Sequence, residues 1–218
     1  MLGSMKTNEL SYYERARALL ARNGLVRLSE FAAAGITTAT ISRMEKRGDL
    51  VRVGRGIYQL PDQSVDANHD LAVAAKLVPN GVICLVSALA FHELTDTIPP
   101  RVWMAIGPKD RKPVITQPAL QIVRFAPAML ARDVERHVID GVAVPITTSV
   151  RTVVDLFRYR ASAGRRYQKS PGLNLALEGL REALRTRKAT PAEIARLAEE
   201  LGAWKAMRPY VEALTSHA

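Results

Sequence analysis

The order of short segments in the first sixty residues constrains the fold of this chain more than any other feature. Helix-forming stretches at 9–22, 29–34 and 38–47 are each followed closely by a glycine. Residues 50–60, LVRVGRGIYQL, then place two short runs of alternating apolar residues around a Gly-Arg-Gly tip, which is typical of a hairpin. Three helices and a hairpin in this order predict a winged helix-turn-helix.

The third of these helices has a polar and cationic outer face. With Ile41 and Met44 turned to the core, steps of about 100° per residue leave small, hydroxylic and basic residues outside. Such a face suits the major groove of DNA, and an arginine at a hairpin tip suits the phosphate backbone. The alternative is an ordinary solvated surface. The expected DNA contacts are Thr38, Ser42, Arg43, Lys46 and Arg47 on the helix, with Arg52 and Arg55 in the hairpin.

Beyond a linker at 61–64 the pattern changes to mixed strands and helices, so the expected fold class is α+β. Strands are expected at 81–85, 102–106, 120–125, 134–138 and 142–146, the last two forming a hairpin. Helices are expected at 66–77, 87–94 (capped by Ser87), 149–159, 173–184, 191–201 and 203–214. The predicted organisation is a disordered or tag-derived leader at 1–8, a DNA-binding domain at 9–62 and an α/β domain at 66–218.

The composition is basic, which fits either an anionic partner, such as nucleic acid, an acidic protein or a membrane surface, or an ordinary solvated basic surface. Lys and Arg number 31 against 21 Asp and Glu, which gives a net charge of +10 and a pI near 10.1. No uncharged apolar run reaches the roughly 20 residues that span a bilayer, and the N-terminus lacks the apolar core of a secretion signal. The single cysteine, Cys84, excludes an intramolecular disulfide. We expect a cytoplasmic, nucleoid-associated protein with no membrane contact.

The second half offers no convincing catalytic, metal or cofactor site. The histidines and Cys84 lack metal-ligand spacing, and Ser87 and His92 are better explained by packing than by nucleophile–base chemistry. The Asp110-Arg111-Lys112 tripeptide has the form of a nuclease motif, but the flanking prolines predict a loop. Asp155 is expected to form a salt bridge with Arg151 or Arg158.

A basic segment follows the predicted helix at 149–159. Its cations have no acidic residue among them, so the segment is either a solvated linker or a contact for DNA backbone or for an acidic protein face. Its members are Arg158, Arg160, Arg165, Arg166 and Lys169.

Residues 24–61, GLVRLSEFAAAGITTATISRMEKRGDLVRVGRGIYQLP, resemble the winged-helix domain of the AbiEi family, the antitoxins of AbiE-type (type IV-like) toxin–antitoxin systems used in phage defence. The likeness lies in the Gly-Ile after the second helix, the Arg-Gly-Asp-Leu at the end of the third and the Arg-Gly-Ile-Tyr of the hairpin. Ser87-Ala88-Leu89 with His92 and Leu94-Thr95, and the segment 147–156, TTSVRTVVDL, resemble the second domain of that family. The third helix begins Thr37-Thr38-Ala39-Thr40, which is less basic than is usual there.

The resemblance implies a non-enzymatic repressor that binds operator double-stranded DNA in front of its own operon. It also implies that the second domain counteracts a nucleotidyltransferase-like toxin encoded nearby. For the oligomeric state we expect a monomer or a weak dimer. Two alternatives stay open. The chain could be a stand-alone winged-helix regulator with a ligand-sensing or dimerisation domain, or an enzyme on nucleic acid with the winged helix as its targeting module.

Overall fold

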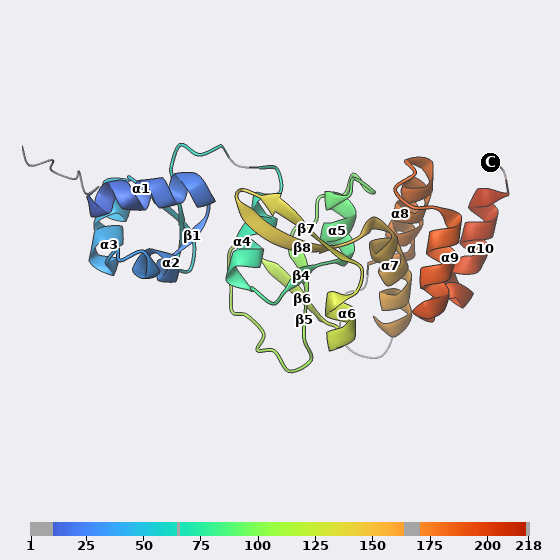
Figure 1. Ribbon diagram of the computed structural model, residues 1–218. Coiled ribbons are helices and arrows are strands. Elements are labelled where there is room, and N and C mark those ends of the chain that lie inside the picture. Colours follow the sequence, from blue (N-terminus) through green and yellow to red (C-terminus); the bar gives the residue numbers. More distant parts are fainter. Residues whose placement is uncertain (1–10, 65, 164–170, 217–218) are drawn as a thin grey trace, which may run out of the picture. The chain divides into compact units, whose positions relative to one another are not determined.

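The computed structural model describes residues 11–64, 66–163 and 171–216, and the side chains of all of these except 160–163 (Figure 1). The leader predicted at 1–8 lies outside the described residues. Contacts divide the chain into two compact units. The first holds the described residues up to Leu77 together with Val138–Ala143, and the second holds Val78–His137 and the described residues from Val144 onward. The mixed α/β class expected from the sequence is confirmed.

The first unit contains the predicted helices and hairpin. The helices are α1 (Tyr12–Asn23), α2 (Leu28–Ala33), α3 (Thr38–Arg47) and α4 (His69–Leu77). The strands are β1 (Val26–Arg27), β2 (Val51–Gly54) and β3 (Ile57–Gln59), which form an antiparallel sheet in the order β1-β3-β2. The hairpin is confirmed. Strand β1 was not predicted, because two residues are too few to show a period.

The core of the first unit packs the helices on the sheet. The rings of Phe31 and Tyr58 meet edge to face with centroids 6.2 Å apart. Ile41 and Met44 of α3 are each 1% exposed, as their spacing predicts. Tyr12, in the first turn of α1 and one residue after the capping Ser11, is 55% exposed.

Helix α4 packs against β2 and β3 within this unit. A Cβ atom added at Gly54 would lie 3.4 Å from Leu77 Cδ1 and 3.6 Å from Val73 Cγ1, so the helix covers the strand closely there. Lys76 Nζ forms an ion pair with Glu30 Oε2 of α2 at 2.7 Å. The hairpin therefore rests on a helix and is not a free arm.

The second unit is built on a mixed sheet in the order β6-β5-β4-β8-β7. Its strands are β4 (Val82–Ile83), β5 (Val102–Ile106), β6 (Leu120–Arg124), β7 (Val134–Ile139) and β8 (Val142–Thr147), although the end of β7 and the start of β8, at Val138–Ala143, are counted with the first unit. Strand β4 runs antiparallel to β5 and parallel to β8, and β5 runs parallel to β6. Asp140 and Gly141 both have positive φ, 47° and 73°, as the predicted two-residue turn between β7 and β8 requires.

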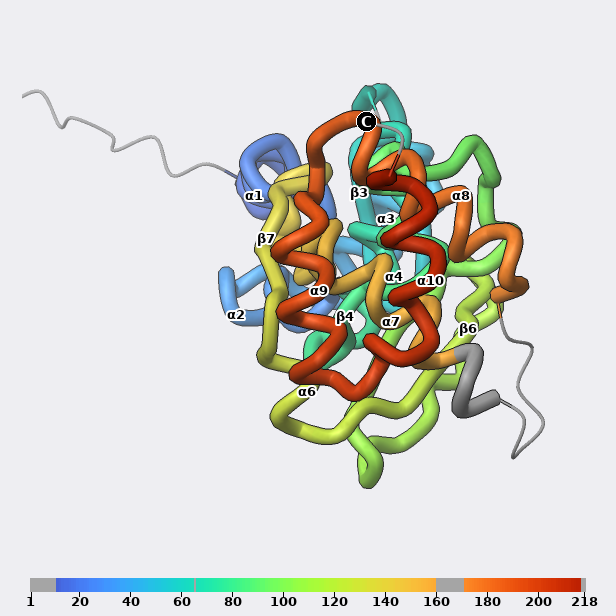
Figure 2. Tube along the Cα trace, turned by 90° about the vertical axis from the view of Figure 1, so that its right-hand side faces the viewer, coloured from blue at the N-terminus to red at the C-terminus, as the bar shows by residue number. Residues whose placement is uncertain are grey.

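The helices of this unit are α5 (Leu85–Phe91), α6 (Pro127–Ala131), α7 (Ser149–Ala163), α8 (Leu173–Arg185), α9 (Pro191–Glu200) and α10 (Trp204–Thr215). Helix α7 contacts α5, α8 and α9, and Figure 2 shows α9 and α10 running side by side next to it. The shared core includes Leu89, Val153, Leu180, Ile194 and Met207. Thr190 and Glu193 form a capping box at the start of α9, the helix predicted at 191–201.

Two predictions at the start of the second unit are wrong. Strand β4 ends at Ile83, and helix α5 begins at Leu85 with Cys84 as its N-cap, so the strand is shorter and the helix starts earlier than expected. Ser87 is inside that helix and does not cap it; its Oγ accepts a hydrogen bond from Trp103 N at 2.9 Å. An unbroken apolar run hides this change from strand to helix. Helix α6 was not predicted. No helix in the described parts of the chain is long and apolar enough to cross a membrane.

Candidate nucleic-acid interface

Thr37 and Gly48 fix the two ends of helix α3. Thr37 accepts a hydrogen bond from Thr40 N at 3.3 Å, which caps the start of the helix. Gly48 ends it in the left-handed conformation with φ 78°, where a side chain would be strained. Because both ends are fixed, the outward face of α3 is held in one register.

That face carries the predicted contacts. Thr38, Arg43, Lys46 and Arg47 are exposed, and Ser42 is half-buried at the border with the core. The Arg43 Nε donates to the Ala39 carbonyl oxygen at 3.3 Å, so its guanidinium lies along the helix surface. On the outward face of α3, threonine and alanine side chains lie next to the basic residues. Because these side chains are small, they permit close approach to base edges.

The hairpin presents its two arginines at the surface. Arg55 is exposed at the tip, between Gly54 and Gly56. Arg52 is exposed on β2, pairs across the strands with Tyr58, and donates from Nε to the Gly54 carbonyl oxygen at 3.2 Å. The pairing shifts register between Arg52 and Gly54, which marks a bulge just before the tip.

The Tyr58 hydroxyl links the hairpin to α3 electrostatically. Burial raises the pKa of Tyr58 most, the Glu45 carboxylate of α3 raises it further, and Arg52 opposes them. Both charges therefore lie within range of the same phenol. The Glu45 carboxylate of α3 and the Arg52 guanidinium of β2 thus both act on the Tyr58 phenol.

The two glycines of the tip have different roles. Gly56 has φ 67°, which glycine adopts without strain and which the turn requires. Gly54 has a packing role, because Leu77 and Val73 of α4 lie against it. The sequence alone does not show this contact, because Val73 and Leu77 lie about twenty residues further along the chain.

Little of the predicted basic segment lies in the described part of the chain. Arg158 is on α7, where its Nη1 is 3.7 Å from Asp155 Oδ1. The side chains of Arg160, Arg165, Arg166 and Lys169 lie outside what the structure describes.

The predicted salt bridge of Asp155 is confirmed and is deeply buried. Arg151 is fully buried, and its Nε donates to Asp155 Oδ2 at 2.7 Å. Its two terminal nitrogens donate to the carbonyl oxygens of Arg132, at 2.9 Å, and Met129, at 3.3 Å. The Arg151 guanidinium thereby ties α7 to the end of α6, which indicates a structural role.

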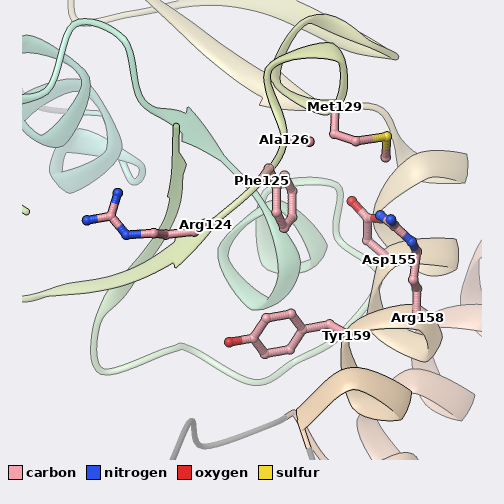
Figure 3. Close-up of a pocket in the computed structure, with 7 residues that line it drawn as sticks. All are labelled: Arg124, Phe125, Ala126, Met129, Asp155, Arg158 and Tyr159. Atoms are coloured by element: carbon pink, nitrogen blue, oxygen red, sulfur yellow. The ribbon is translucent and has the colours of Figure 1, made fainter. Parts of the chain in front are cut away.

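A pocket of about 300 Å³ lies beside this pair in the second unit (Figure 3). Figure 3 shows the Asp155 carboxyl next to the Arg158 guanidinium on one wall, the Phe125 ring between, and the Arg124 guanidinium turned away on the other side. The lining combines apolar and charged groups: Arg124, Phe125, Ala126, Met129, Asp155, Arg158 and Tyr159. None of the pocket was predicted, because its residues come from the end of β6, from α6 and from α7, which are separated by some twenty-five residues in the sequence.

The residues weighed for catalysis are bonded elsewhere. His92 Nε2 lies 2.7 Å from the Thr147 carbonyl oxygen, and Ser87 bonds Trp103 N, so both serve the backbone. Cys84 is fully buried, and burial raises the pKa of its thiol. Asp110 lies in a loop, as predicted, and its Oδ2 accepts a hydrogen bond from Gly107 N at 2.7 Å. Among the described residues, no group of three or more His, Cys, Asp or Glu side chains is placed to hold a metal ion.

Comparison with known proteins gives a family for the N-terminal region and a fold for the chain. Residues 14–61 match the family model described as "Transcriptional regulator, AbiEi antitoxin". The RV2827C protein from Mycobacterium tuberculosis, known from a crystal structure, has a similar fold with a TM-score of 0.62 and 16% sequence identity. The match covers 94% of this chain and 78% of that one. A search of curated proteins found no significant match.

The matched residues run from the first turn of α1 to just past β3, and so contain the helices, the hairpin and the predicted DNA contacts. Residues 14–61 of this chain therefore carry the sequence pattern of the AbiEi antitoxin transcriptional regulators, the family that the sequence resembles.

Proposed function

We propose that the chain is an antitoxin that binds operator DNA through its N-terminal winged helix and represses its own operon. The observation that carries this proposal is the outward face of α3, whose exposed Arg43, Lys46 and Arg47 form no ion pair with any carboxylate in the described residues. The family match of residues 14–61 supports it independently. In this proposal residues 9–62 bind DNA.

Each side chain has a distinct expected role on the duplex. Thr38, Ser42 and Arg43 lie in the major groove, where the small residues allow approach and arginine reads a base edge. Lys46 and Arg47 contact phosphates beside the groove. Arg52 and Arg55 contact the neighbouring backbone or minor groove and set affinity more than sequence preference.

Single substitutions separate these roles. Arg55→Ala should weaken binding to every duplex and flatten the salt dependence by about one phosphate contact, roughly 0.9 in the slope of log K against log salt. Ser42→Ala or Arg43→Ala should change preference among operator sequences by about 1–3 kcal/mol for each lost base contact. Fluorescence anisotropy on duplexes from upstream of the gene measures both. An Arg55→Ala slope equal to that of the unmodified protein would remove Arg55 from the interface.

The region from residue 66 to residue 218 is the proposed antitoxin part, which opposes a nucleotidyltransferase-like toxin encoded nearby. The basic segment of Arg158, Arg160, Arg165, Arg166 and Lys169 would contact either DNA backbone or an acidic face of that toxin. No catalytic residue, metal or cofactor enters the proposal, and the chain acts in the cytoplasm as a monomer or weak dimer.

Repression and neutralisation can be separated in the full chain. A variant with Arg43→Gln, Lys46→Gln and Arg55→Gln should lose repression of a reporter driven by the upstream region but still rescue cells that express the neighbouring toxin. Co-purification of tagged toxin with this variant would show that contact is direct. Loss of rescue together with repression, in a variant that remains folded, would contradict the division of roles.

A second candidate function is a stand-alone regulator whose second unit senses a small molecule. The pocket of about 300 Å³ beside Asp155 and Arg158 is the observation that favours it. Absence of a toxin gene from the neighbourhood, together with operator release by a cell metabolite extract, would support this function over the antitoxin.

A further inference from the structure

The loop between β5 and β6 is long and has no regular structure. It covers residues 107–119 and joins two parallel strands without a helix or strand of its own. Parallel neighbours are usually joined through a helix, and long irregular loops in compact domains usually carry function or are disordered. Here the loop has a defined shape, so a function is the better explanation.

Two side chains give the first part of the loop that shape. Asp110 Oδ2 accepts a hydrogen bond from Gly107 N at 2.7 Å, which closes a tight turn. Arg124 pairs with Ile106 across the parallel strands, and its Nη1 donates to the carbonyl oxygens of Gly107, at 2.5 Å, and Pro108, at 3.0 Å. The acidic side chain of the loop is thus bonded to backbone rather than to a neighbouring cation.

The remaining charges of the loop are positive and face solvent. Lys109, Arg111 and Lys112 are exposed, and within the described residues none of them is in an ion pair. Elsewhere in the second unit exposed cations are often paired, as in Arg196 with Glu200 at 3.3 Å. Three cations in four residues, on a braced turn, concentrate positive charge at the ends of β5 and β6.

We infer that this basic loop, defined as Lys109, Arg111 and Lys112, is a second binding site for the phosphate backbone of duplex DNA. The inference extends the proposed operator binding and rests on it for the identity of the ligand. Phosphate contacts need exposed cationic donors and no apolar complement. An acidic protein partner fits less well, because lysine is depleted at protein–protein interfaces and two of the three cations are lysines.

The inference has a measurable consequence for affinity. Each phosphate neutralised adds about 0.9 to the slope of log K against log salt, so three contacts add about 2.7. Between about 50 and 200 mM salt, those three contacts alone weaken binding roughly 40-fold.

The test uses the full chain and anisotropy titrations on a 40-base-pair duplex from upstream of the gene. The loop variant is Lys109→Gln with Arg111→Gln and Lys112→Gln. The control is Arg136→Gln with Arg181→Gln and Lys205→Gln, which removes the same charge from exposed positions on β7, α8 and α10. We expect the loop variant to lower the salt slope by two to three and the control to leave it within about 0.5. Arg111→Gln alone, which perturbs the loop least, should lower it by about 0.9.

Other outcomes overturn the inference in distinguishable ways. An equal decrease of the salt slope in the loop variant and in the control would show a general effect of net charge. An unchanged slope in the loop variant, while Arg55→Ala lowers it, would leave the proposed function standing and remove the loop from the interface. If the loop variant kept its salt slope but no longer rescued cells that express the toxin, the loop would be a contact for protein and not for DNA. No duplex binding by the unmodified chain would refute both the inference and the proposed function.

Discussion

Removing the charge of Asp155 should destabilise the second unit strongly. In Asp155→Asn the Arg151 guanidinium, which is fully buried, would keep two carbonyl acceptors but lose its carboxylate. Breaking a buried ion pair by removing one partner typically costs about 3–5 kcal/mol, because the remaining charge stays out of water. Arg158, whose Nη1 is 3.7 Å from the same carboxylate, is also a cation and supplies no negative charge to Arg151. The expected loss of stability therefore stays in this range.

Both tryptophans of the chain, Trp103 and Trp204, lie in the second unit, so their fluorescence during urea unfolding reports on it selectively. We expect Asp155→Asn to lower its free energy of unfolding by about 3–5 kcal/mol. The double variant Arg151→Met with Asp155→Leu should lose much less, because replacing both partners leaves no buried charge. A loss below about 1 kcal/mol in the single variant, or a double variant no better than it, would refute this reasoning.

Three further changes test other parts of the account. Thr37→Ala should lower the stability of the first unit by about 1 kcal/mol through loss of the α3 cap, measured by circular dichroism; an unchanged midpoint would contradict the cap assignment. Burial is the main cause that lowers the pKa of His92 below 6.5, so the unfolded chain binds more protons and stability should fall as pH drops below about 6.5. His92→Gln should flatten this dependence in urea titrations from about pH 7.5 to 5.5, and an equally steep loss would exclude His92 as its cause. Gly179→Ala would place a Cβ 2.6 Å from Leu89 Cδ1, so the overpacking cost of about 1–3 kcal/mol should exceed the gain of up to about 1 kcal/mol in helix propensity; a stabilised variant would show that Leu89 moves freely.

The sequence predicted best those elements whose ends are marked by local chemistry. Thr37 and Gly48 delimit α3, and Thr190 begins α9, because caps and left-handed glycines act within a few residues. The start of α5 was not predicted correctly because Val82 to Val86 is a continuous apolar run, in which a change from strand to helix leaves no periodic trace.

The candidate site was predictable where its residues are close in sequence. The contacts proposed on α3 and the hairpin follow from helical spacing and one turn. The role of Arg124 in shaping the β5–β6 loop depends on its pairing with Ile106, and the cover of Gly54 by α4 depends on packing between segments some twenty residues apart. The tripeptide at 110–112 was weighed only as a nuclease motif, because sequence alone does not show that Asp110 is bonded to the backbone while its basic neighbours face solvent.

The central claim is that α3 and the hairpin form one DNA-binding surface. The most direct measurement compares two double variants of the full chain on the upstream duplex, Arg43→Gln with Arg55→Gln, and Arg17→Gln with Arg22→Gln. All four arginines are exposed, and the second pair lies on α1. We expect the first variant to bind at least tenfold more weakly, with a salt slope lower by about two, and the second to stay close to the unmodified protein. Equal binding by both variants would contradict the account.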